Sequence, residues 1–171
     1  MLEHLSDPKL GIIVALLFAR LKTSTYRFPF LGIAINLAGT VLHELCHYVA
    51  ALLLNGKPIG FSLIPRRVHD GWVLGSVESS NVRWYNAFPI AMAPVLLLGA
   101  AYYLDVWYGA YIVQPSLLSD LVYILAVVVL VENAIPSLQD FRVALSNIPG
   151  AAIYTVIIIF LLVDVIHIAG G

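Results

Sequence analysis

The stretch FPFLGIAINLAGTVLHELCHYVAALLL, residues 28–54, decides how the rest of the chain is interpreted. It is mostly apolar and longer than the roughly 20 residues that a helix needs to cross a bilayer core about 30 Å thick. It nevertheless carries two histidines and a glutamate in its second half. Ionisable side chains at membrane depth are costly and usually mark a functional site. The stretch therefore predicts a transmembrane helix that carries functional groups.

The composition of the whole chain also favours a membrane protein. Of its 171 residues, 61% are hydrophobic and 11% are charged, whereas about a quarter of the residues in a soluble domain are charged. With a mean hydropathy of +0.93, so short a chain has too little interior to bury its apolar surface, and disorder is excluded as well. A formal net charge of −1 gives no electrostatic footprint for nucleic acid, and a single cysteine excludes a disulfide framework.

Other apolar segments flank this first one. Ala87–Leu104, Leu117–Pro136 and Ala151–Ile168 follow it, and the shorter Leu10–Ala19 precedes it. We interpret Leu10–Ala19 as a retained helix; the alternative, a cleaved signal peptide, is disfavoured by the basic residues that follow it. The predicted fold is an all-α membrane protein, a polytopic bundle of about five transmembrane helices that forms a single domain over residues 1–171.

The longest polar stretch, Asn55–Arg83, follows the second predicted helix. Within it, Ile59–Ile64 and Trp72–Val77 are rich in apolar and β-branched residues. Turn-forming sequences, Pro65-Arg66-Arg67 and Asp70-Gly71, separate them. This pattern predicts a short β-hairpin or a pair of strands beside the membrane, with an irregular amphipathic loop as the alternative.

The second predicted helix contains the pattern H-E-x-x-H as His43-Glu44-Leu45-Cys46-His47. Histidines at positions i and i+4 share one helix face, so both imidazoles can reach one metal ion. Glu44 lies beside them and can take a proton from a metal-bound water. Asn36 and Thr40 continue the same polar stripe. A hydrogen-bonded seam between helices is the alternative, and it accounts for Asn36 and Thr40 better than for two histidines that flank a glutamate.

A catalytic zinc site usually has three protein ligands and one open position. The candidates for the third ligand are the other ionisable residues predicted near membrane depth: Asp105, Asp120, Glu132, Asp140, Asp164 and His167. Asp140 is favoured because Pro136 breaks the preceding helix and lets the carboxylate turn inward. The predicted helix directions also bring Asp140 to the side at which the histidine-bearing helix ends, and Asp164 and His167 to the opposite side. Glu132, in unbroken helix before Pro136, is the main rival.

The pairing of His43-Glu44-x-x-His47 with Asn133-x-x-Pro136-x-x-x-Asp140 resembles the site-2 protease family of intramembrane zinc metalloproteases, in a minimal form without PDZ or CBS domains. Ala91-Met92-Ala93-Pro94 is similar to the segment of small residues and proline that this family carries between the two motifs. The resemblance covers roughly Gly32 to Ala144. At Cys46, Ala93 and Phe141 the family usually carries glycine.

The resemblance implies an intramembrane zinc endopeptidase that hydrolyses peptide bonds in or near the transmembrane segments of other membrane proteins. His43, His47 and Asp140 would bind one zinc ion, Glu44 would be the general base on a zinc-bound water, and Asn133 would position substrate or brace the site. Two alternatives stay open. One is a non-proteolytic membrane protein that binds or transports a metal or coordinates haem. The other is a catalytically silent regulator that binds transmembrane helices.

The distribution of Lys and Arg between the loops predicts an orientation. One side receives six of them, namely Lys9, Lys57, Arg66, Arg67, Arg83 and Arg142, and the other side receives Arg20, Lys22 and Arg27. The loops Asn55–Arg83 and Ser137–Asn147 are therefore predicted to be cytoplasmic. The chain would be a multi-pass protein of the cell membrane whose active site faces the cytoplasm. Its partners would be the lipid bilayer and a membrane-protein substrate, and no oligomeric state is predicted.

Overall fold

The computed structural model describes residues 29–63, 66–68, 71–73 and 75–169. The predicted first helix, Leu10–Ala19, lies outside these residues. The described part of the chain is mostly helical, with a small antiparallel β element after its first helix. The prediction of a helical fold with a β-hairpin-like element is therefore confirmed at this level.

In the described part of the chain, one helix precedes the β element, and a series of helices separated by short breaks follows it. The helices are α2 (Pro29–Leu53), α3 (Ala87–Ala91), the 3-10 turn η1 (Ala93–Val95), α4 (Leu96–Tyr111), α5 (Leu117–Asn133), α6 (Leu138–Leu145) and α7 (Ile148–Ala169). The predicted single helix over Ala87–Leu104 is wrong, because the chain forms α3, a break and then α4. Pro94 has no N–H for a helical hydrogen bond, and its ring crowds the preceding turn. The predicted break at Pro136 is confirmed, since α5 ends at Asn133 and α6 continues at 45° to it.

The polar stretch folds as one long, two-part hairpin. β1 (Pro58–Ser62) pairs antiparallel with β4 (Ser76–Ser79), and β2 (Arg66–Val68) pairs antiparallel with β3 (Gly71–Val73). The predicted strand Ile59–Ile64 corresponds to β1. The predicted strand Trp72–Val77 is divided between the end of β3 and the start of β4, so the hairpin has a base and a tip where the pattern predicted a single pair.

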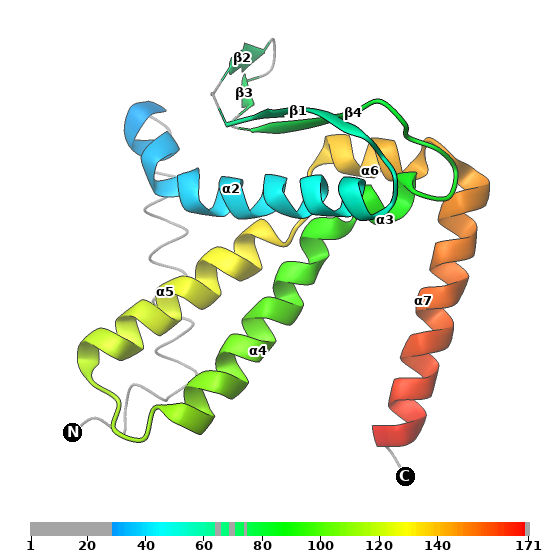
Figure 1. Cartoon of the computed structure of the whole chain (residues 1–171). Coiled ribbons are helices and arrows are strands. Elements are labelled where there is room, and N and C mark those ends of the chain that lie inside the picture. Colours follow the sequence, from blue (N-terminus) through cyan, green and yellow to red (C-terminus); the bar gives the residue numbers. More distant parts are fainter. Residues whose placement is uncertain (1–28, 64–65, 69–70, 74, 170–171) are drawn as a thin grey trace.

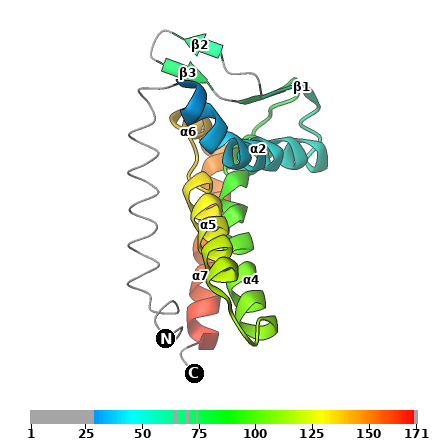
Figure 2. The ribbon, with the colours of Figure 1, turned by 90° about the vertical axis from the view of Figure 1, so that its left-hand side faces the viewer.

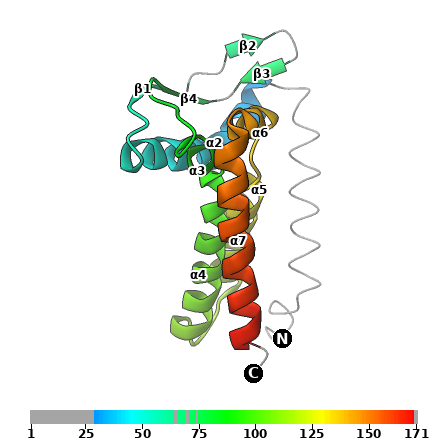
Figure 3. The same ribbon diagram turned by 90° about the vertical axis from the view of Figure 1, so that its right-hand side faces the viewer.

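The helix axes run in two main directions (Figure 1). α4 and α5 lie antiparallel, and α7 stands apart from them, whereas α2 lies across the end at which α5 finishes and α4 begins. Figure 2, turned by 90°, shows the same crossing of α2 over this end. The β1–β4 pair lies over α2, and α6 lies beside α3 at the same end of the molecule (Figure 3). The loop after α2 and the loop after α5 therefore share one end, as the helix directions predicted, but α2 does not run parallel to α4 and α5.

The tightest packing lies around α3. The buried side chains there are small: Ala51, Ala87, Ala91, Ala93, Ala134 and Ala144 are all at most 4% exposed. Small side chains let helix backbones approach closely.

Asn86 is fully buried at the start of α3. Its amide nitrogen donates to the carbonyls of Leu54 and Asn81, at 3.2 and 2.9 Å, and its oxygen accepts from the N–H of Arg83 at 2.6 Å. These bonds fix α3 against the end of α2.

No single helix among the described residues is both long and apolar enough to cross a membrane, whereas α5 and α6 together meet that test as a bent pair. The number and the course of the transmembrane helices stay a prediction.

Candidate metal centre

Three potential ligands from two distant parts of the chain converge in the structure. His43 and His47 lie one turn apart on α2, and Asp140 lies in the first turn of α6. The Nε2 atoms of the histidines are 3.2 Å apart. Asp140 Oδ2 lies 3.4 Å from His43 Nε2, and Asp140 Oδ1 lies 3.2 Å from His47 Nε2. One ligand atom from each residue lies within 4.8 Å of the other two, so the group could hold a metal ion.

Both histidines are held so that Nε2 is free to bind a metal. His43 Nδ1 lies 2.8 Å from the carbonyl oxygen of Asn133, and His47 Nδ1 lies 2.8 Å from that of Ile90. Because a carbonyl oxygen only accepts hydrogen bonds, each Nδ1 must carry the proton. A neutral imidazole then has its lone pair on Nε2. Such outer contacts commonly fix the tautomer and ring orientation of metal-binding histidines.

Proline breaks explain why these two carbonyls are available. In a continuous helix the Ile90 carbonyl would accept from residue 94, but Pro94 has no N–H. In the same way, the Asn133 carbonyl would accept from residue 137, but the N–H of Ser137 donates to Asp140 Oδ2 at 2.6 Å. Each broken helix therefore leaves a carbonyl that accepts from a histidine of α2.

Asp140 is placed by the start of α6. Ser137 is the N-cap residue, and its hydroxyl accepts from the N–H of Asp140 at 3.2 Å, while the Asp140 carboxylate accepts from the N–H of Ser137. This reciprocal pair is a capping box with aspartate in the usual place of glutamate. The capping box turns the Asp140 carboxylate back toward Ser137, between α5 and α6. On that side it faces the two histidines of α2.

The donor set fits zinc. Zinc binds imidazole nitrogen at about 2.0–2.1 Å in tetrahedral sites, which requires ligand atoms about 3.3–3.4 Å apart. The two histidine Nε2 atoms, 3.2 Å apart, agree with that edge, and each lies 3.2–3.4 Å from one of the two Asp140 carboxylate oxygens. Three electron-rich atoms that face one another also repel unless a cation lies between them. Two neutral imidazoles and one carboxylate are, in addition, a ligand combination that catalytic zinc sites use.

The three ligands line one end of a cleft of about 1070 Å³. Their side chains are 9–16% exposed, so a small molecule can reach them. Glu44 and Asn133 line the same cleft, and so does β4. Glu44 follows His43 directly on α2 and is half-buried. The cleft therefore brings a carboxylate that is not part of the ligand group next to that group.

Asn133 contacts the site through its backbone carbonyl, and its side chain lies at a close approach of two helices. Its carbonyl holds His43, and its amide nitrogen donates to the carbonyl of Val129 at 2.8 Å. A Cβ atom on Gly39 would lie 2.0 Å from the Asn133 amide nitrogen. Gly39 thus allows α2 to touch α5 at the level of the site.

We expect Gly39→Ala to destabilise the protein and to weaken metal binding, because the new methyl group would push Asn133 away from His43. Overpacking of this kind costs roughly 1–3 kcal/mol. The matched control is Gly99→Ala on α4, where a Cβ atom would meet nothing within 4 Å. Thermal unfolding and zinc titration of both variants measure the difference. Equal melting temperatures and equal zinc affinities in the two variants would contradict the role of Gly39.

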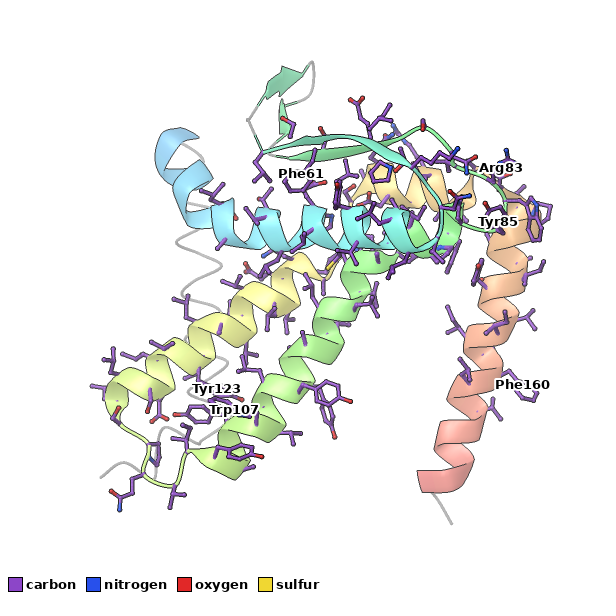
Figure 4. The ribbon with its side chains drawn as sticks, in the orientation of Figure 1. Phe61, Arg83, Tyr85, Trp107, Tyr123 and Phe160 are labelled. Atoms are coloured by element: carbon purple, nitrogen blue, oxygen red, sulfur yellow. The ribbon has the colours of Figure 1, made fainter. Side chains whose placement is uncertain are left out.

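None of the rival third ligands with a described side chain belongs to the ligand group. Glu132 lines the cleft but is not in the ligand group. Asp120 accepts a hydrogen bond from Tyr108 at 2.5 Å, and Asp105 accepts one from Tyr123. Figure 4 shows Tyr123 at the far end of the α4–α5 pair, away from α2. Asp164 and His167 belong to the last part of α7, which runs away from the site. Asp140 is therefore the candidate that the fold brings to the two histidines.

Sequence analysis missed Ile90, whose carbonyl accepts from His47, and Gly75, which lines the cleft, as parts of the site. Pro94, four residues after Ile90, was the available signal for a free carbonyl.

Comparisons of the chain with protein-family models, curated proteins and solved structures found no match. The identity of the metal and the roles of Glu44 and Asn133 stay predictions.

Proposed function

We propose that the protein is an intramembrane zinc endopeptidase, similar to the site-2 proteases, that cleaves other membrane proteins in or near their transmembrane segments. The observation that carries this proposal is the convergence of His43, His47 and Asp140 in a cleft that also holds Glu44. Binding or transport of a metal needs no base beside the ligands, whereas hydrolysis does. Glu44 therefore favours a hydrolase over a metal carrier.

The proposed reaction divides the work among these groups. Zinc bound by the three ligands would polarise the scissile carbonyl and lower the pKa of water. Glu44 accepts the proton of the attacking water and passes it to the leaving amine. The carbonyls of Ile90 and Asn133 hold the two imidazoles in place through the reaction.

The β4 strand offers a means of holding the substrate. It lines the cleft beside the ligand group and is paired only on its β1 side among the described strands. An extended polypeptide can add to such an edge through main-chain hydrogen bonds. A substrate helix would have to unwind locally to do so, and this exposes the peptide bond to be cut. The proposal thus predicts weak sequence preference and strong dependence on local unwinding.

The apolar surface of the helices supports a membrane location. Every residue in the run 156–161 of α7 is at least 44% exposed, and at 100° per residue this run covers all sides of the helix. Phe160 points outward from α7, away from α4 and α5 (Figure 4). A helix that is apolar all round is normally buried in protein or in lipid. We therefore propose that lipid surrounds α7.

The decisive experiment combines metal analysis with a cleavage assay. Purified protein in proteoliposomes would be analysed for zinc and mixed with a panel of single-span reporter proteins, with and without a chelator. We expect about one zinc ion per chain and cleavage that the chelator abolishes and added zinc restores. Zinc without cleavage of any reporter would favour the non-proteolytic alternatives, and absence of zinc would overturn the proposal.

The proposed orientation predicts a labelling pattern. Cysteines introduced at Arg67 or Ser146, after replacement of Cys46, should be shielded from an impermeant thiol reagent in intact cells and labelled after the membrane is opened. Arg67 lies on β2 and Ser146 lies between α6 and α7, in the two segments predicted to be cytoplasmic. Labelling of either cysteine from outside would reverse the predicted orientation.

A further inference from the structure

Gly75 is the point at which the hairpin touches the proposed base. It directly precedes β4 and lines the cleft. A Cβ atom at this position would lie 2.7 Å from Cγ of Glu44, 3.1 Å from its Oε1 and 3.0 Å from Cγ2 of Thr40. Contacts below 3.0 Å essentially do not occur for real Cβ atoms. The backbone of the hairpin therefore lies directly against the Glu44 side chain.

The absence of a side chain, not backbone freedom, is what this position requires. Gly75 does not have the positive φ that favours glycine. An alanine there would be acceptable to the backbone and unacceptable only to Glu44 and Thr40. Gly60 on β1 is the useful comparison, because its φ is likewise not positive and its Cβ would lie an ordinary 3.5 Å from Glu78.

The hairpin is anchored in a way that keeps this contact in place. Phe61 of β1 packs edge-on against Tyr48 of α2, with ring centroids 5.6 Å apart. Figure 4 shows Phe61 between the sheet and α2. Phe61 is paired with Val77 across the sheet, so an aromatic contact on β1 holds β4 close to the face of α2 that carries Glu44. Because this anchor holds the hairpin in place, a side chain at position 75 would displace the Glu44 side chain rather than β4.

We propose that Gly75 is a positioning residue for Glu44. Its bare backbone restricts the Glu44 carboxylate to one side of the cleft and lets the β4 edge lie within reach of the ligand group. An extended substrate added to β4 would then carry its scissile carbonyl past Glu44 and the histidines. This inference rests on the proposed function, since it assigns Glu44 the role of base and β4 the role of substrate edge.

The test compares Gly75→Ala with Gly60→Ala on a reporter that the parent protein cleaves. We expect Gly75→Ala to lower kcat roughly 10–100-fold, the loss that a misplacement of about 1 Å can cause. Its KM, zinc content and melting temperature should stay near those of the parent, because the substrate edge and the ligand group are unchanged. Gly60→Ala should match the parent in all four measurements. A parental kcat in Gly75→Ala would overturn the inference, and so would a loss of zinc or a fall in stability that accounts for the reduced kcat.

A cross-link tests the contact without any activity measurement. In a Cys46→Ala background, Thr40→Cys combined with Gly75→Cys should form a disulfide on mild oxidation, because Cβ atoms within about 4.5 Å can be bridged. Thr40→Cys with Gly60→Cys should not. Absence of the first cross-link would overturn the contact. Parent protein that binds zinc but cleaves no reporter would contradict the proposed protease function, while a cross-link in the double variant would leave the contact itself standing.

Discussion

Asp140→Asn should reduce zinc affinity by more than about 100-fold and abolish reporter cleavage. The amide keeps the shape of the carboxylate but loses its charge, and it presents at most one oxygen to the metal. Changes in outer contacts alone commonly cost 10–100-fold in metal affinity, so the loss of a ligand should cost more. The amide can still accept from the N–H of Ser137, so α6 should keep its capping box and the protein should stay folded. Zinc titration of the purified variant measures the effect.

Glu132→Gln is the matched control for this change. Glu132 lines the same cleft and lies eight residues earlier in the chain, but its side chain is not in the ligand group. We expect this variant to keep zinc at the parental affinity. The opposite result, zinc lost in Glu132→Gln and kept in Asp140→Asn, would show that the third ligand has been assigned to the wrong carboxylate.

The local chemistry of the site was predictable because it follows from short-range rules. The spacing of His43 and His47 places them on one face of any α-helix. Pro136 ends α5 wherever that helix lies, and this frees the chain to bring Asp140 back toward α2. The structure confirms both consequences and brings the three side chains within 4.8 Å. The shared face of the histidines and the break at Pro136 did not depend on how the helices are arranged in space, whereas the choice of Asp140 also used the predicted helix directions.

The arrangement of the helices was less predictable, because an apolar pattern gives length and not direction. Residues 28–54 were interpreted as a transmembrane helix in one bundle with the other predicted helices. The structure instead lays α2 across the end of the α4–α5 pair (Figure 1). Asp140 reaches the histidines because α5 ends beneath α2, not because parallel helices bring the two to the same depth.

At Pro94 the sequence carried a signal for a helix break, but the length of the apolar run outweighed it in the prediction. The apolar run Ala87–Leu104 is long enough for a span, and its length favoured one helix. Pro94 lies in the interior of that run, where a proline commonly kinks or breaks a helix. The break produces α3, η1 and α4, and it frees the Ile90 carbonyl for His47. A helix-breaking residue here serves the site directly.

Glu44→Gln should separate catalysis from metal binding. Glutamine keeps the length and shape of the side chain, so its close approach to Gly75 should persist. It cannot accept a proton at neutral pH, and loss of a general base typically costs roughly 10²–10⁴-fold in rate. Zinc content should stay at the parental level, because Glu44 is not in the ligand group.

The same carboxylate-to-amide change at a distant position controls for nonspecific effects. Asp105→Asn, at the far end of the α4–α5 pair, alters an exposed carboxylate that accepts from Tyr123, and it should leave the cleavage rate near that of the parent. Rates of zinc-loaded parent, Glu44→Gln and Asp105→Asn would be compared on one reporter in proteoliposomes. A Glu44→Gln rate near the parental value would remove Glu44 as the base. Because Glu44 is the feature that favours hydrolysis over metal binding alone, the same result would leave the His43–His47–Asp140 group as a metal site without an assigned reaction.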